Sequence, residues 1–247
     1  MFNTSLVFAF LLTLIAGLST GIGGIIVIFA RKNGKWLPGF SMGFSAGVMT
    51  VVSFGDLLPE STHMLSAHLG MEWGGIISVS AFFVGLFCAA IIDKLVPETP
   101  NNDVGRVGIV SMIAMIIHNL PEGIATFMAG YQDAGLGISI AIAIALHNIP
   151  EGISVAIPIY YSTGKKSKAV MYALVSGLSE PLGAVLTAVI LWRFIDEKML
   201  GFLFGIIAGI MVYIAFNELI PLSAKMVEQL SVFVGVVLGV FVMLFVI

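Results

Sequence analysis

The chain has 247 residues, of which 59% are hydrophobic and 10% are charged, with a formal net charge of −3 and a mean hydropathy of +1.09. Soluble domains are roughly 45–50% apolar and about 25% charged, so a soluble fold of this size would have too little polar surface to meet water. The composition excludes an ordinary cytosolic enzyme, a nucleic-acid-binding protein and a disordered chain, and the single cysteine, Cys88, excludes a disulfide framework.

Eight stretches are apolar enough to cross a lipid bilayer as helices, each of which needs about 20 residues. Four of them carry no charge: Phe2–Ala30, Trp36–Gly55, Trp73–Ile92 and Leu230–Ile247. The other four carry isolated acidic residues and lie near residues 107–130, 134–161, 169–192 and 199–222. The sequence therefore predicts an all-α integral membrane fold with eight transmembrane helices, in a single transporter domain that covers residues 1–247.

The basic residues are divided unequally between the two sides of these spans. Nine of the eleven Lys and Arg residues fall in the loops after the first, third, fifth and seventh spans, and the opposite side holds Arg193 and Lys198. Because cytoplasmic loops are enriched in Lys and Arg, both termini are predicted to lie outside the cytoplasm.

Two parts of the chain resemble each other internally. Gly43–Ser61 aligns without gaps to Gly205–Ser223, with eight identical residues in 19 positions. The matched spans are five apart in order, so the two copies run through the bilayer in opposite directions, as in transporters built from inverted repeats. We expect inverted repeats of three helices each, over about residues 5–95 and 169–247, around two central helices at about 107–161, which is a 3+2+3 arrangement.

The two central spans carry one motif twice, 29 residues apart, as His118-Asn-Leu-Pro-Glu-Gly123 and His147-Asn-Ile-Pro-Glu-Gly152. Ionisable groups in the hydrocarbon cost about 2.5–3.5 kcal/mol each on insertion scales and by default mark function. Within each motif the His and Glu are four residues apart and project together from one helix face. Imidazole nitrogen with carboxylate and amide oxygen suits zinc, iron(II), cobalt(II) or manganese(II). The predicted metal ligands in the sixth and the two central spans are His118, Asn119, Glu122, His147, Asn148, Glu151 and Glu180.

A second interpretation is that these polar side chains pair with one another and hold helices together. Glu122, Glu151 and Glu180 would repel one another without a cation, although proton uptake would also relieve that repulsion. Pairing does not explain the two asparagines. Prolines follow or precede the acidic residues directly and free backbone carbonyls, which are tolerated at membrane depth where they line a polar cavity.

Several polar or soft residues outside the cluster allow two interpretations. Asp56 and Glu218, at matching positions of the repeats, either line an entrance or exit for the ion or have a capping or interfacial role at a helix end. His63 and His68 lie in an expected external loop and either collect metal ions or form a solvated face. Met49 is either a core residue or a soft supplement to the metal site.

The two motifs, together with SGLSEPLGA in the sixth span, resemble the signature of the ZIP (Zrt/Irt-like) metal transporters, and the resemblance covers essentially the whole chain. It implies a two-metal site between the fourth, fifth and sixth spans. One metal position would use His118, Glu122, His147 and Glu151, with Met49 nearby. The second would use Asn119, Asn148, Glu151 and Glu180, with Glu151 bridging the two metals.

The resemblance also implies import of divalent metal into the cytoplasm across a bacterial inner membrane, an elevator-like movement and a homodimer. No catalytic residue and no prosthetic cofactor are expected, and the partners are the metal substrate and the lipid bilayer. Many members carry a long, His-rich loop after the third span. Here that loop is Val96–Arg106, which has no histidine, so metal sensing through it is not expected.

Three functions compete on the residues alone. A divalent-metal transporter uses the duplicated His, Glu and Asn residues directly. An intramembrane metallohydrolase would need a closed three-ligand site with a separate general base, and a carrier of an organic solute would not need two His–Glu pairs. We expect broad selectivity among zinc, iron(II), cobalt(II) and manganese(II), because geometry and availability decide among them.

Overall fold

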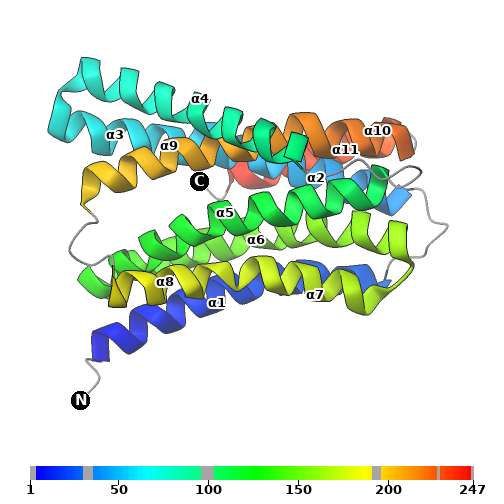
Figure 1. Ribbon diagram of the computed structural model, residues 1–247, viewed down its shortest axis with the longest axis horizontal. Helices are drawn as coiled ribbons and strands as arrows, with labels where there is room; N and C mark the ends of the chain where they lie inside the picture. Colours follow the sequence, from blue (N-terminus) through cyan, green and yellow to red (C-terminus); the bar gives the residue numbers. More distant parts are fainter. Residues whose placement is uncertain (1–3, 30–35, 96–102, 191–195, 227–228, 246–247) are drawn as a thin grey trace.

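The computed structural model describes residues 4–29, 36–95, 103–190, 196–226 and 229–245, and the regular structure within these ranges is helical (Figure 1). The α-helices are α1 Thr4–Ile26, α2 Trp36–Val52, α3 Leu58–Leu69, α4 Met71–Leu95, α5 Asp103–Gln132, α6 Ala134–Thr163, α7 Lys166–Gly177, α8 Ser179–Val189, α9 Glu197–Tyr213, α10 Ile220–Met226 and α11 Gln229–Leu244. A short 3₁₀ segment, η1 (Val27–Phe29), ends the first helix. Two π-helical segments, η2 (Ser53–Leu57) and η4 (Ile214–Leu219), join α2 to α3 and α9 to α10.

Seven helical stretches of the described chain are long and apolar enough to cross a membrane, which confirms an all-helical, multi-pass membrane protein. The last apolar stretch, predicted as Leu230–Ile247, is described as α11, a helix of 16 residues. At 1.5 Å per residue, α11 is about 24 Å long, which is shorter than the roughly 30 Å hydrocarbon core. Residues 246–247 lie outside the described ranges, and the eighth span stays a prediction.

The segment that holds His63 and His68 is helical, so the prediction that it forms a loop is wrong, and its external location stays a prediction. Residues Trp36–Leu69 form one helical stretch, in which η2 continues α2 into α3. Ser61 and Leu65, four residues apart, are buried where α3 packs on α4 and α9. This packing stabilises a helix whose remaining faces are polar, so hydropathy alone did not reveal it.

The helices group into two bundles that lie side by side in Figure 1. We call α1 and α5–α8 the site bundle, and α2–α4 with α9–α11 the flanking bundle. Within the site bundle α6 packs on α1 and α5, and α8 packs on α5; within the flanking bundle α11 packs on α2 and α9 on α4. The bundles meet mainly where α2 lies against α6.

Large apolar side chains lie on the outside of these bundles and small ones lie between helices. On α1 the exposed stripe recurs every three or four residues, at Leu11, Ile15, Leu18, Ile22 and Ile25. The buried face of the same helix carries mainly Ala, Gly, Ser and Thr. Small residues at contacts and large apolar residues facing outward are typical of helices packed in lipid.

Glycines allow the closest of these helix contacts. A Cβ added to Gly152 of α6 would collide with the carbonyl of Thr20 in α1, and one added to Gly123 of α5 would collide with the carbonyl of Glu180 in α8. The burial pattern of residues 11–29 also recurs position by position in residues 171–189. The contact of α6 with α1 thus has the same form as the contact of α5 with α8.

Candidate metal centre

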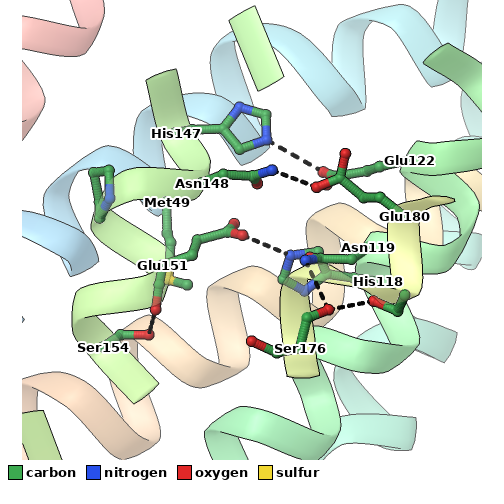
Figure 2. Close-up of polar contacts among 12 residues, drawn as sticks. Met49, His118, Asn119, Glu122, His147, Asn148, Glu151, Ser154, Ser176 and Glu180 are labelled. Atoms are coloured by element: carbon green, nitrogen blue, oxygen red, sulfur yellow. Dashed lines mark hydrogen bonds and ion pairs between the residues drawn. The ribbon is translucent and has the colours of Figure 1, made fainter. Parts of the chain in front are cut away.

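The seven polar residues predicted from the three spans come together in the middle of the site bundle (Figure 2). Helix α5 supplies His118, Asn119 and Glu122, α6 supplies His147, Asn148 and Glu151, and α8 supplies Glu180. Each residue is at most 2% exposed. Each of these groups therefore needs a polar or ionic partner inside the protein, because burying it without one is costly.

Each histidine is paired with the glutamate of the other motif. His118 Nε2 lies 3.1 Å from Glu151 Oε2, and His147 Nε2 lies 3.4 Å from Glu122 Oε1. Since His and Glu are four apart on each helix, we expected them to project together. They do face the same space, but the pairs formed are between α5 and α6 rather than within either helix.

Three of the residues are close enough to share one ion. His118, Glu122 and Glu151 each offer a ligand atom, and these atoms lie within 4.8 Å of one another. Nitrogen and carboxylate oxygen together suit borderline divalent ions such as zinc. His147 lies next to this group because it pairs with Glu122, but it is not one of the three residues.

Backbone carbonyls orient the two asparagines. Asn148 Nδ2 donates to the carbonyl of Ala16 at 3.0 Å and also to Glu180 Oε1. Asn119 Nδ2 donates to the carbonyl of Ser176 at 3.3 Å. With the amide nitrogens held in this way, each side-chain oxygen is free to accept a bond or bind a cation.

Several buried oxygens around the centre make no hydrogen bond within the described part of the chain. They are Asn119 Oδ1, Asn148 Oδ1, Glu122 Oε2, Glu151 Oε1 and Glu180 Oε2. Buried polar atoms are nearly always satisfied, so a group of unsatisfied oxygens needs an explanation. All of them are acceptors, which suits the centre to binding cations.

The break between α7 and α8 positions Glu180. Helix α7 ends at Gly177 and α8 begins at Ser179, which places Glu180 in the first turn of α8. Pro181 has no N–H to bond the carbonyl of Gly177, as its position in the sequence predicts. The carbonyl of Ser176 accepts from Asn119 and also from Ser179 Oγ at 2.5 Å, so the break supplies acceptors to the site.

A cavity of about 480 Å³ connects the centre to one end of the molecule. Glu122 and His147 line its inner part, and Glu60 and Glu197 line it near the ends of α3 and α9. Asp56, on η2, lines the same cavity. Of the roles considered for Asp56, this position favours lining an entrance for the ion over capping a helix end.

Of the remaining candidates, Glu218, His63 and His68 lie away from the cluster, and Met49 lies beside it. Glu218 is buried on η4 and does not line this cavity. His63 is 81% exposed, 3.9 Å from Glu60, and His68 lies 3.0 Å from Glu197. Met49 is fully buried in the apolar cluster between α2 and α6, beside the site helices (Figure 2).

Three contacts at the site were not predicted. The carbonyls of Ala16 and Ser176 orient the asparagines, and Ser45 Oγ of α2 donates to the carbonyl of Pro150 at 2.5 Å, next to Glu151. Backbone carbonyls carry no residue-type signal, and Ser45 lies 105 residues from its partner, so no local pattern could indicate these contacts.

Comparison with known proteins adds a family. A family model described as "ZIP Zinc transporter" matches residues 98–247. The zinc transporter ZupT of Chlorobaculum parvum is 44% identical and covers 98% of this chain and 97% of its own length. The zinc transporters ZupT of Akkermansia muciniphila and Streptococcus mutans are each 42% identical, and each covers 95% of this chain and 94% of its own length.

Proposed function

This chain belongs to the ZIP zinc transporter family, and from that premise we propose that it imports zinc, together with iron(II), cobalt(II) and manganese(II), into the cytoplasm. Relatives that cover nearly the whole chain are zinc transporters, so the protein is a transporter rather than an enzyme. Membership of this family therefore argues against the two competing functions, an intramembrane metallohydrolase and a carrier of an organic solute.

The observation that carries the proposal is the buried group of His, Glu and Asn ligands at the inner end of a cavity. An ion entering past Asp56 would exchange its water for the Glu122 carboxylate and then for His118 and Glu151. Replacing water with preformed ligands at membrane depth offsets the cost of bringing a divalent ion into the hydrocarbon.

We further propose two metal positions in this centre. The first uses His118, Glu122, His147 and Glu151, with Met49 close by. The second uses Asn119, Asn148, Glu151 and Glu180. The fixed asparagine amides and the unsatisfied oxygens of Glu151 and Glu180 support a second ion next to the first.

For the whole chain we propose one domain, residues 1–247, with eight spans in a 3+2+3 arrangement. The inverted repeats are residues 5–95 and 169–247, and the central helices cover residues 107–161. The recurring glycine contacts and burial pattern support this symmetry. The termini would lie outside the cytoplasm, in a bacterial inner membrane.

Transport would proceed by movement of the site bundle against the flanking bundle, in a protein that forms a homodimer. All seven polar ligands belong to the site bundle, so this bundle can move with the metal centre intact. This distribution supports the elevator-like movement.

The decisive measurement is ⁶⁵Zn uptake into proteoliposomes. Glu151→Ala removes the carboxylate shared by both proposed positions and is expected to reduce uptake by at least 100-fold. Glu72→Ala, an exposed glutamate on α4, is the matched control and is expected to retain wild-type uptake. Wild-type uptake by Glu151→Ala at equal reconstitution would refute the proposal. Competition with iron(II), cobalt(II) and manganese(II) tests the breadth of selectivity.

A further inference from the structure

An apolar groove lies on the outer surface of the site bundle, away from the metal centre. It has a volume of about 460 Å³ and lies between the end of α1 and the first half of α7, which pack side by side (Figure 1). Its lining is Ile28, Val170, Met171 and Leu174, with Lys166 and Ser167 at one end. Ile28 is 48% exposed and Met171 58%, so apolar surface is open to the surroundings.

Lys166 lies at one end of the groove lining, and two more lysines lie next to it in the sequence. Lys165, Lys166 and Lys168 occupy the α6–α7 connection and the first turn of α7, and none has a carboxylate ion-pair partner among the described residues. Lys166 Nζ donates to the carbonyl of Ile28 at 2.5 Å, which fixes it above the groove. Lys168 Nζ lies 5.4 Å from the centre of the Tyr172 ring, which leaves its N–H groups available for an anion.

The position of the groove relative to the membrane narrows the choice of ligand. The three candidate spans Thr4–Phe29, Gly137–Thr163 and Lys166–Val189 all have an end here. The lysines are therefore at the level of lipid headgroups, and the apolar lining extends from them toward the hydrocarbon. Basic residues at this level attract anionic lipids by about 1 kcal/mol each.

We propose that this groove is a binding site for one anionic phospholipid. The phosphate would lie against Lys165, Lys166 and Lys168, and an acyl chain would lie along Ile28, Val170 and Met171. Charge complementarity carries the choice, because three neighbouring cations without carboxylate partners in the described part of the chain favour an anionic headgroup over a zwitterionic one. The lipid would hold α1 against α7, and through α7 would support the helix break before Glu180.

The test is native mass spectrometry of the purified full chain in detergent with dioleoyl phosphatidylglycerol or dioleoyl phosphatidylcholine. The wild type is expected to retain phosphatidylglycerol and to release phosphatidylcholine. The double variant K165Q/K168Q leaves the Lys166 bond to Ile28 in place and is expected to weaken phosphatidylglycerol retention roughly 10- to 30-fold. The control K94Q/K198Q makes the same change of charge on exposed lysines elsewhere and is expected to retain the lipid.

A second pair of variants tests the apolar half of the site. Met171→Trp fills the groove without changing charge and is expected to displace phosphatidylglycerol. Val175→Trp, 43% exposed one turn further along α7 and outside the lining, is expected to leave it bound. Thermal unfolding and zinc uptake of each variant check that the fold persists.

Three results would overturn the proposal. The first is equal retention of the two lipids by the wild type. The second is equal loss of phosphatidylglycerol from K165Q/K168Q and K94Q/K198Q. The third is a lipid-free dimer that Met171→Trp dissociates, because a second copy of the chain would then cover the groove.

Discussion

The crossed pairing of the two motifs gives each ionisable side chain of the centre a defined role. His118 and His147 pair with Glu151 and Glu122, respectively, and the second oxygen of each glutamate makes no hydrogen bond among the described residues. Removing a single carboxylate therefore changes both the ligand count and the pairing. Effects of substitutions here are expected to be non-additive, because the residues form one network.

Glu180→Gln tests whether the centre holds two ions. A glutamine keeps an acceptor for Asn148 but removes the negative charge, so the proposed second position loses its strongest ligand. We expect bound zinc to fall from two ions to one per chain, measured by elemental analysis after equilibrium dialysis. Glu72→Gln, which is exposed, serves as the control. Two ions bound to Glu180→Gln would contradict the assignment of Glu180.

The residue types of the centre could be predicted from the sequence, but their partners could not. Polar residues within apolar runs are conspicuous because each is costly there, which identified His118, Glu122 and Glu180. The spacing of four predicted a shared face, whereas the pairing depends on how α5 crosses α6. The helices around this pair are held by backbone contacts of Gly123 with α8 and of Gly152 with α1, which join segments far apart in the sequence.

At the scale of elements, the glycine contacts hold the site helices at their observed separation. Gly152→Ala would place a Cβ against the carbonyl of Thr20, so α1 and α6 would have to separate. We expect the free energy of unfolding to fall by about 1–3 kcal/mol, as for other overpacked contacts. Thermal unfolding in detergent measures the effect.

Gly75→Ala is the matched control for this substitution. Gly75 lies within α4, and a Cβ added there meets no atom within 4 Å among the described residues. Alanine is expected to leave stability unchanged or raise it by up to about 1 kcal/mol, because it restricts the unfolded chain. Equal destabilisation by the two substitutions would show that helix crowding is not the cause.

Hydropathy predicted the long apolar helices well, but it predicted poorly a helix such as α3, which has one packed face and polar remaining faces. The helices around residues 107–130 and 134–161 are continuous apolar runs, and the structure has α5 and α6 there. Helix α3 escaped prediction because only one of its faces packs, at Ser61 and Leu65. No local sequence pattern predicted the π-helical segments η2 and η4 either.

Across the whole molecule, a polar contact ties the two bundles together at the end opposite the cavity. Arg106 of α5 bonds Asp93 of α4 at 2.7 Å, and Tyr213 of α9 donates to the other oxygen of Asp93 at 2.9 Å. Gln132, at the C-terminal end of α5, lines the cavity. The described cavity thus lies toward one end of α5, and this contact lies toward the other.

Arg106→Gln is expected to loosen this contact between the bundles. It removes the charged donor from Asp93, which costs about 1–3 kcal/mol for a partly buried pair. We expect faster amide hydrogen exchange in the first turns of α5 and in α9 near Tyr213, measured by mass spectrometry. Lys94→Gln on the same side, which is exposed, is expected to leave exchange unchanged. Unchanged exchange in Arg106→Gln would show that the contact does not hold the bundles together.

The sidedness predicted from basic residues can be measured in intact cells. In a Cys88→Ser background, a cysteine at Lys198 is expected to react with a membrane-impermeant thiol reagent added from outside, and one at Lys94 only after permeabilisation. Both positions are exposed, so accessibility to the reagent is comparable. The opposite pattern of labelling would reverse the predicted orientation.

The crossed His–Glu pairs also limit how the molecule can move. A slip of α5 along α6 by one helical turn, about 5.4 Å, would separate both pairs at once and leave four buried ionisable groups alone. In the proposed elevator-like movement, α5 and α6 would therefore move together. Sliding would then take place at the border with α2, where Ser45 Oγ bonds the carbonyl of Pro150. A hydroxyl rotates freely and can exchange one carbonyl for the next, so this border can change register at low cost.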